Sequence, residues 1–281
     1  MNFFIIKFNY FCENEFKNDE IICDSIEDFS ELTYKKDGIF ILQTNIRSMN
    51  ANFNEFEVML SKLKKKPDII VCTESWRIQS INQFKLHGYQ IYYTEGKRTR
   101  ADGVIVYIRD SYDKSVEIIK LGELNVIRVE LNDSYNNKYI ITAISRLHCM
   151  KISSFITKLK NYLEKNKNYT KHIILGDINI DLLKFNEGIV EYISLMSDYE
   201  FLSGVNTVTR PEKGTCIDHI FCKGLDSYQN YNIHSMISDH YITALLINNV
   251  KFNNKINSIL LKTDFNKLKR LAKNTKWNNI L

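Results

Sequence analysis

Apolar runs alternate with amphipathic segments along the chain, and this alternation predicts its secondary structure. Short apolar or alternating runs bounded by turn residues and charges are typical of strands. We expect strands at 39–42, 69–72, 89–93, 103–109, 115–120, 126–131, 138–144, 172–175, 216–222 and 241–247. Apolar residues recur at helical spacing in 53–63, 155–163, 187–199 and 264–273. We expect helices there, the first of them stopping at Lys66-Pro67.

The pattern predicts a layered α/β domain. Several of the strands are apolar throughout, so both of their faces should be covered. With only two prolines and ten glycines in 281 residues, a long turn-rich linker is not expected. We predict a main domain at 38–248, an acidic N-terminal extension at 1–37 and a basic tail at 249–281. For the extension, an extra edge element and a mobile segment both remain open.

Charge is spread unevenly along the chain and does not by itself assign a function. The net charge is +5, but residues 1–37 hold 4 basic and 9 acidic side chains, whereas residues 251–281 hold 8 basic and 1 acidic. A basic tail favours polyanions, although a lysine-rich terminus is more often simply solvated.

The six cysteines indicate a reducing, intracellular compartment, because they are scattered and form no Cys-x-x-Cys pair. The spacing Cys216-x-x-His219-x-x-Cys222 resembles that of a metal site, but the predicted strand argues against one. On a strand, Cys216 and Cys222 would face one way and His219 the other. No apolar run approaches the length of a membrane span, so we expect no membrane association.

The first candidate for chemistry is the octet from His172 to Asn179. Its apolar run ends at Gly176, and Asp177 and Asn179 follow. Glycine releases the backbone, so both polar side chains can turn into a pocket beyond the strand. An ordinary Gly-Asp turn with a local side-chain hydrogen bond is the competing interpretation.

Two other predicted strands end in the same manner, at Asn45 and at Glu74. In open α/β sheets, ligands bind beyond the carboxyl ends of the strands. Two carboxylates and two amides meeting there would form an all-oxygen site of the kind that holds Mg²⁺ or Mn²⁺ with a substrate phosphate.

Two later stretches place carboxylates beside histidine. Asp218 interrupts a strand-like run, and Ser238-Asp239-His240 precedes the last predicted strand. Asp218 could hold one ring nitrogen of His240 and raise its pKa, leaving the other nitrogen to donate to a phosphate. Taken alone, Ser-Asp-His is more simply a turn with a surface histidine.

Together these motifs resemble a known superfamily. Asn45, Glu74, Gly176-Asp177-x-Asn179, Ile217-Asp218-His219-Ile220 and Ser238-Asp239-His240 occur in the order found in the endonuclease/exonuclease/phosphatase superfamily. Four longer stretches look like the apurinic-type endonuclease domain of jockey-like non-LTR retrotransposons: 44–48, 69–76, 173–183 and Thr209-Arg210 ahead of 217–221. The resemblance covers roughly 38–248.

The resemblance implies a four-layer α/β sandwich like that of deoxyribonuclease I, with two mixed β-sheets face to face and helices outside. It implies hydrolysis of a DNA phosphodiester with Mg²⁺ or Mn²⁺ as the cofactor. The nick would expose a 3′-hydroxyl that primes a reverse transcriptase, encoded downstream in a parent element. DNA is the expected partner, no small-molecule cofactor is expected, and the expected location is nuclear.

The resemblance also implies a role for each matching residue. Glu74 would be the principal metal ligand, with Asn45 beside it and Asp239 supporting the metal. Asp177 would activate the attacking water, and Asn179 would hold the scissile phosphate. Asp218 would orient His240, which would stabilise charge on the phosphoryl oxygens.

The chain departs from the family after strand 138–144. Relatives place a tyrosine there, whereas this chain reads Ser145-Arg146-Leu147-His148. Ser145 is too short to make the tyrosine's contact, so His148 or a water would replace it, or the rate would fall. A lost hydrogen bond to a developing charge costs about 2.7–4 kcal/mol, which predicts a slow enzyme more than an inactive one.

Basic side chains complete the predicted site. Arg47, Ser145 and Arg146 are expected at the substrate, and Arg98 and Arg100 could track a DNA backbone.

Two alternatives remain open. One is a catalytically decayed domain that only binds nucleic acid. The other keeps the fold but hydrolyses a lipid or inositol phosphate.

Overall fold

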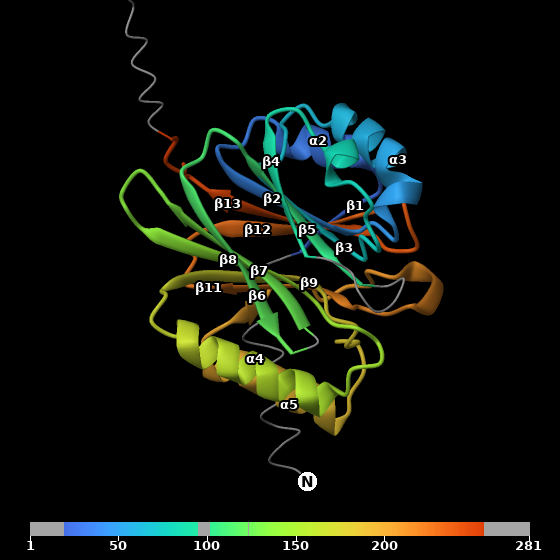
Figure 1. Ribbon diagram of the computed structural model, residues 1–281, viewed down its shortest axis with the longest axis vertical. Coiled ribbons are helices and arrows are strands. Elements are labelled where there is room, and N and C mark those ends of the chain that lie inside the picture. Colours follow the sequence, from blue (N-terminus) through green and yellow to red (C-terminus); the bar gives the residue numbers. More distant parts are fainter. Residues whose placement is uncertain (1–19, 95–101, 123, 256–281) are drawn as a thin grey trace, which may run out of the picture.

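The chain folds into two β-sheets that lie face to face, with helices outside them (Figure 1). The computed structural model describes residues 20–94, 102–122 and 124–255. In spatial order, the seven-stranded sheet contains β1 (Ile21–Cys23), β12 (Tyr228–Ile233), β13 (Ile242–Asn248), β2 (Gly38–Asn45), β3 (Ile69–Thr73), β5 (Val104–Arg109) and β4 (Tyr89–Tyr93). The six-stranded sheet contains β10 (Leu202–Ser203), β11 (Asp218–Lys223), β9 (Lys171–Asp177), β8 (Lys138–Ser145), β7 (Leu124–Asn132) and β6 (Lys114–Leu121).

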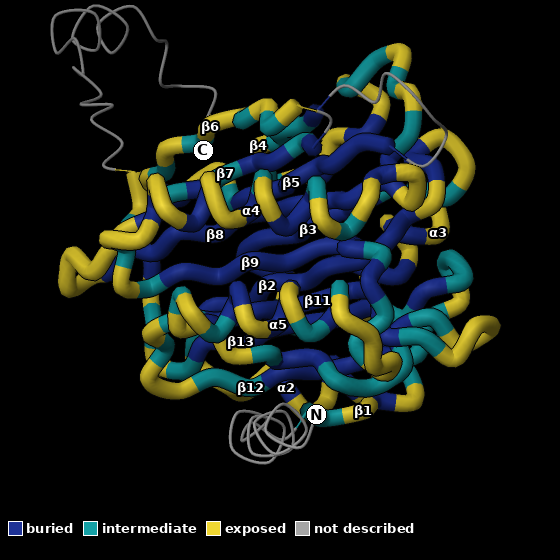
Figure 2. Tube along the Cα trace, turned by 90° about the horizontal axis from the view of Figure 1, so that it is seen from below, coloured by how far each residue is buried: buried dark blue, intermediate teal, exposed yellow. Residues whose placement is uncertain are grey.

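One pair of helices covers the outer face of each sheet. Helices α2 (Ile26–Thr33) and α3 (Met49–Lys62) pack on the seven-stranded sheet, and α4 (Ile152–Asn166) and α5 (Glu187–Asp198) pack on the six-stranded one (Figures 1 and 2). Short 3₁₀ helices occur at Ile81–Phe84 and Pro211–Lys213. Within the described ranges, every helix falls short of the length and apolarity needed to span a membrane. The predicted four-layer α/β sandwich is confirmed.

Three apolar cores fill the spaces between the four layers, and strand periodicity produces them. In β2, Ile39 and Ile41 face the other sheet, whereas Phe40 and Leu42 face α2 and α3. This alternation follows from the two-residue period of a strand. Because alternate residues of each strand pack into different cores, both faces of these strands are apolar, as the sequence pattern predicted.

The strands and helices predicted within the described ranges are present, with ends shifted by a few residues. Strand β12 was not predicted, although it lies between β1 and β13. Its sequence, Tyr228-Gln-Asn-Tyr-Asn-Ile, is too polar to be read as a buried strand. Asn232 is nevertheless buried, and its amide donates to Thr207 Oγ1 and to the Val208 carbonyl oxygen. Tertiary hydrogen bonds therefore hold the amide nitrogen of Asn232 in a strand that the sequence pattern does not reveal.

The fold extends beyond both predicted domain boundaries. Strand β1 pairs in parallel with β12, and the buried side chains of Cys23, Ile26 and Phe29 pack against the seven-stranded sheet. Residue 38, the predicted start of the domain, therefore falls inside the fold. At the other end, Phe252 is buried between the sheets. The helix expected at 264–273 lies outside the described residues.

Candidate active site

The candidate site lies where one end of each sheet meets the other. Asn45 ends β2 and Asp177 ends β9, and the Asn45 amide nitrogen donates to Asp177 Oδ2 across 2.8 Å. Asp218 begins β11 and is the register partner of Asp177. The site therefore draws its side chains from both sheets, and residues 132 positions apart become direct neighbours.

A buried carboxylate and a buried imidazole form the centre of the site. Asp218 Oδ2 lies 2.7 Å from His240 Nδ1, and Gln43 donates to Asp218 Oδ1 across 3.0 Å. Burial alone would lower the pKa of His240, but the charge and hydrogen bond of Asp218, with the charges of Asp177 and Asp239, raise it to about 9. The ring is therefore an imidazolium at neutral pH. The predicted pairing of Asp218 with His240 is present in the structure.

Asp177 is fully buried beside this pair. Burial raises its pKa, and the neighbouring carboxylates of Asp218 and Glu74 add to the increase, against the opposing effect of His240. Its Oδ1 accepts from the Asn179 backbone N–H across 3.1 Å. A carboxylate with a raised pKa is suited to accept a proton at neutral pH.

Arg146 holds the loop that follows β9. Its guanidinium donates to the carbonyl oxygens of Ile178 and Asn179, each at 2.6 Å, and also to that of Met150. The Asn179 side-chain amide donates back to the Arg146 carbonyl oxygen across 2.9 Å. The buried guanidinium is thus committed to backbone carbonyls, and its predicted substrate contact stays a prediction. Arg146 positions Asn179.

Glu74 lies near the cluster around Asp177, and its carboxylate is unpaired within the described residues. It follows β3 with a left-handed φ of 51°, and its carbonyl oxygen accepts from the Ser48 N–H across 2.9 Å. Its side chain is half-buried, and no hydrogen bond or ion pair joins the carboxylate to another residue in the described ranges. Its charge still acts on Asp177. An unpaired carboxylate close to a second one is suited to binding a cation.

The acidic residues fit a divalent cation. Ligand atoms of Asp177, Asp218 and His240 lie within 4.8 Å of one another. His240 Nδ1 is already bonded to Asp218 and the ring is protonated, so it is a poor ligand. The carboxylate of Glu74, which lies outside this cluster, and the amide oxygen of Asn45 are the remaining oxygen donors.

Asp239 makes contacts that the sequence did not predict. Its Oδ1 lies 3.0 Å from Arg47 Nη1, and its Oδ2 lies 2.6 Å from Arg210 Nη2. Two arginines thus engage the carboxylate that was expected to support the metal. Arg210 was absent from the predicted site residues, although Thr209-Arg210 stands among the stretches that carry the resemblance.

Ser145 and His148 lie on the segment where the family tyrosine was expected. Ser145 Oγ is buried and has no hydrogen-bond partner. His148 is exposed at the rim, where partial burial lowers its pKa and the charge of Glu74 opposes that change. Arg98 and Arg100 lie outside the described residues.

The Cys216-His219-Cys222 stretch is not a metal site. Cys216 and Cys222 face the core between the sheets, whereas His219 stacks on Tyr192 of α5, with ring centroids 5.7 Å apart. The predicted opposite orientation of the histidine is confirmed.

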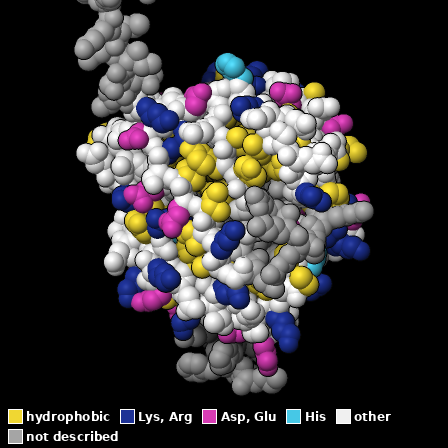
Figure 3. Space-filling model, in the orientation of Figure 1, with side chains coloured by type: hydrophobic (Ala, Val, Ile, Leu, Met, Phe, Trp, Pro, Cys, Tyr) yellow, Lys and Arg dark blue, Asp and Glu magenta, His cyan; other side chains and the backbone are white. Residues whose placement is uncertain are grey.

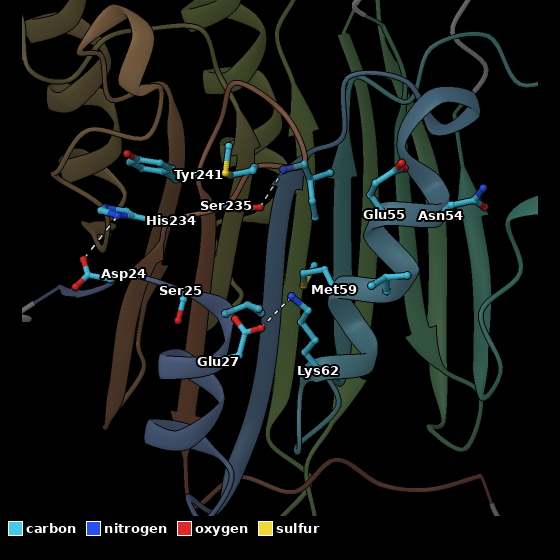
Figure 4. A pocket seen from close by; sticks show the side chains of 14 residues that line it. Asp24, Ser25, Glu27, Asn54, Glu55, Met59, Lys62, His234, Ser235 and Tyr241 are labelled. Atoms are coloured by element: carbon cyan, nitrogen blue, oxygen red, sulfur yellow. Dashed lines mark hydrogen bonds and ion pairs between the residues drawn. The ribbon is translucent and has the colours of Figure 1, made fainter.

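A groove of about 770 Å³ lies apart from this cluster, on the outer side of the seven-stranded sheet. Figure 4 shows its walls: Glu55, Met59 and Lys62 project from α3, and His234 and Tyr241 come from the opposite side. Glu74, Asp177, Asp218 and Asp239 do not line it. We therefore assign the candidate chemistry to the junction of the sheets.

Comparisons with known proteins agree on the fold. No protein-family model and no curated protein matches the sequence. The catalytic domain of Xenopus laevis APE2 superposes with a TM-score of 0.56 at 15% identity, over 77% of this chain and 93% of that one. The endonuclease domain of TRAS1, a telomere-specific non-LTR retrotransposon, gives 0.54 at 14% identity, over 74% and 98%. An endonuclease/exonuclease/phosphatase from Bacteroides vulgatus gives 0.58 at 15% identity, over 78% and 100%.

Proposed function

Since the chain has the fold of the endonuclease/exonuclease/phosphatase superfamily, we propose that it is a metal-dependent phosphodiester hydrolase that nicks DNA. One observation carries the proposal: Asp177, Asp218 and His240 are buried together where the two sheets meet. Burying two carboxylates and an imidazole is costly unless they serve each other or a ligand.

In the proposed reaction, a water oxygen attacks the phosphorus and the bond to the 3′-oxygen breaks. Asp177 accepts the proton of the water, because its raised pKa makes it a competent base. The products are a 5′-phosphate and a 3′-hydroxyl, the latter taking up a proton.

His240 and Asn179 would act on the phosphate itself. Asp218 holds His240 by Nδ1, which leaves Nε2 to donate to a non-bridging phosphoryl oxygen where negative charge accumulates. Asn179, fixed by Arg146, would hold the phosphate in line. A Mg²⁺ or Mn²⁺ held by Glu74 and Asn45 would supply Lewis-acid stabilisation of the same charge.

The test is relaxation of supercoiled plasmid with Mg²⁺ or Mn²⁺. We expect nicking that stops in EDTA and falls at least a hundredfold in Glu74→Gln and Asp177→Asn. Asp226→Asn is the matched control, because its carboxylate is 92% exposed and lies in a surface ion pair with Lys171. Undiminished nicking in EDTA, or in both site variants, would refute the proposal.

A non-LTR retrotransposon origin is the finer part of the proposal. It is supported by the likeness in fold to the TRAS1 domain and by the sequence stretches around Asn45 and Asp177. A nick made by such an enzyme leaves a 3′-end that a polymerase can extend. Extension of nicked plasmid by an added reverse transcriptase tests this, and ends that require phosphatase treatment first would count against it.

A DNA-binding domain without activity is the second candidate, and Ser145 is the observation that favours it. Its buried Oγ lacks a partner where the family tyrosine was expected. On the face shown in Figure 3, lysines and arginines are scattered among acidic side chains and do not form a single basic patch. If wild-type protein binds DNA in a salt-dependent manner but never cuts it, this candidate replaces the first.

Hydrolysis of a lipid or inositol phosphate is distinguished by substrate. Parallel assays with plasmid, sphingomyelin and inositol phosphates should give turnover on plasmid alone. Turnover confined to either of the other two would move the proposal to that substrate.

A further inference from the structure

Asp239 is held between two arginines that come from distant parts of the chain. The Arg47 contact is 3.0 Å and the Arg210 contact is 2.6 Å, one to each carboxylate oxygen. The Asp239 side chain is 5% exposed, whereas those of Arg47 and Arg210 are 52% and 21% exposed. The carboxylate therefore lies at the base of the cluster, and the guanidinium groups reach toward solvent.

Arg47 is fixed by a strained but well-bonded turn. Arg47 and Ser48 have left-handed φ values of 46° and 96°, which cost free energy in residues other than glycine. The Arg47 N–H donates to Asn45 Oδ1 across 3.1 Å, and Asn52 donates to the Ile46 carbonyl oxygen across 2.8 Å. The turn ties Arg47 to a residue of the proposed metal site.

Arg210 is fixed from the other sheet. The preceding residue, Thr209, is buried, and its Oγ1 accepts from the backbone N–H groups of Ile217 and Asp218. The Tyr241 N–H donates to the Thr209 carbonyl oxygen across 2.7 Å. Arg210 is thereby anchored beside both Asp218 and the residue that follows His240.

The cluster keeps unused capacity to bind an anion. A guanidinium has five N–H donors, and Asp239 takes up only part of those on the two arginines. Arg210 Nε is buried and lacks a hydrogen-bond partner among the described residues. Two guanidinium groups and one carboxylate leave one net positive charge next to His240.

A metal ion at Asp239 would have to compete with this arrangement. Both carboxylate oxygens already accept from guanidinium groups, and the two positive charges repel a divalent cation at the same atoms. Burial would raise the pKa of Asp239, but Arg210, His240 and Arg47 together lower it, so the carboxylate is ionised and paired.

We propose that Arg47 and Arg210 bind a DNA backbone phosphate adjacent to the scissile one, and that Asp239 positions them instead of ligating the metal. This inference rests on the proposed function, because it requires DNA as the substrate. The Arg47–Asp239–Arg210 cluster is then a preformed phosphate site, with arginine forks suited to two phosphate oxygens.

Binding of a fluorescent DNA duplex in EDTA tests the phosphate site without hydrolysis. Arg47→Gln and Arg210→Gln should each weaken binding roughly tenfold, as expected for a lost charge-assisted hydrogen bond. Each should reduce the slope of log K against log salt by about 0.9. Arg128→Gln is the matched control, since Arg128 is 22% exposed and paired with Glu117 on the six-stranded sheet.

The Asp239→Asn variant distinguishes a positioning role of Asp239 from a metal-binding role. Removing an acidic group near DNA ordinarily strengthens binding, whereas loss of the positioning carboxylate should weaken it to the level of the single arginine variants. Mn²⁺ affinity, measured by electron paramagnetic resonance, should stay within about twofold in Asp239→Asn and fall at least tenfold in Glu74→Gln.

Each contrary outcome has a separate meaning. An unchanged salt slope in both arginine variants would overturn the phosphate site and leave the nicking reaction standing. Tighter DNA binding by Asp239→Asn, or Mn²⁺ affinity as weak as that of Glu74→Gln, would overturn the positioning role. Failure of the wild-type protein to bind DNA would remove the DNA substrate and the phosphate site together.

Discussion

At the scale of single residues, the surroundings of each histidine set its charge. His240 is buried against Asp218 and carries a raised pKa of about 9, whereas burial with no carboxylate partner lowers the pKa of His172 to about 3. Both side chains are almost completely buried. The difference between them comes from neighbouring charges: carboxylates, Asp218 foremost, raise the pKa of His240, whereas Lys223 and Arg128 lower that of His172 further.

Removal of the Asp218 carboxylate should lower the pKa of His240. In Asp218→Asn, only the charges of Asp177 and Asp239 would still oppose the effect of burial, so the pKa of His240 should fall from about 9 toward its ordinary value of 6.5. The measurement is an NMR titration of the ring in metal-free protein. A pKa that stays near 9 would contradict the assignment of Asp218 as the partner.

His172 should make the fold sensitive to acid. Its folded pKa is about 3 and its ordinary value is 6.5, so the unfolded chain binds more protons between these pH values. Stability is therefore full above pH 6.5 and falls as the pH drops, by up to about 1.4 kcal/mol per unit. Urea unfolding of His172→Gln from pH 7 to 4 should show a shallower loss. Equal loss in this variant and in the exposed control His87→Gln would show that His172 is not responsible.

At the scale of elements, the site is built from strand ends and the turns that follow them. Five of the eight non-glycine residues with positive φ in the described ranges lie in these turns: Arg47, Ser48, Glu74, Trp76 and Asn179. Such conformations persist only where the surrounding hydrogen bonds hold them. The concentration of strain supports the view that these turns are selected for a function.

Gly176, near the end of β9, is a position where no side chain fits. Its φ is +144°, and an added Cβ would lie 1.8 Å from the Ile144 carbonyl oxygen of the neighbouring strand. Gly176→Ala should therefore lower the free energy of unfolding by roughly 3 kcal/mol or more. In Gly214→Ala, where nothing lies within 4 Å and φ is +60°, the cost should be about 1 kcal/mol. Chemical denaturation of both variants makes the comparison, and similar losses would mean that the strands move apart easily.

At the scale of the whole molecule, the four layers depend on a helix that precedes the predicted domain. Phe29 of α2 is fully buried, and its ring lies 5.1 Å from that of Phe40 and 5.0 Å from that of Tyr231. One side chain therefore connects the N-terminal segment to two strands of the seven-stranded sheet.

Truncation of the Phe29 side chain should lower the stability of the fold strongly. Phe29→Ala should cost about 3–5 kcal/mol, the range for a buried aromatic side chain. Leu32→Ala in the same helix, where the side chain is 49% exposed, should change stability by no more than about 0.5 kcal/mol. Thermal unfolding distinguishes the two, and a harmless Phe29→Ala would mean that α2 is dispensable for the fold.

The sequence alone determined the strands with strong apolar patterns, the layered class, and the residues that meet at the site. Asn45, Asp177, Asp218 and His240 could be chosen because strand ends gather at one edge of a sheet, and polar residues placed there have no role in packing. The polar strand β12 and the short β1 could not be chosen, because contacts with distant residues stabilise them, whereas the Ser25 N-cap and the spacing of Ile26 and Phe29 in α2 were local signals that the prediction missed.

The tertiary structure decided which polar groups remain free to act. Arg146 and Arg210 look alike in sequence, yet one is buried on backbone carbonyls and the other faces the site. Asp239 has the side chain of a metal ligand in the sequence, yet in the structure an arginine lies on each of its oxygens. The physical reason is that hydrogen bonds and charge pairs depend on distances of a few ångströms, and those distances are set by residues far away along the chain.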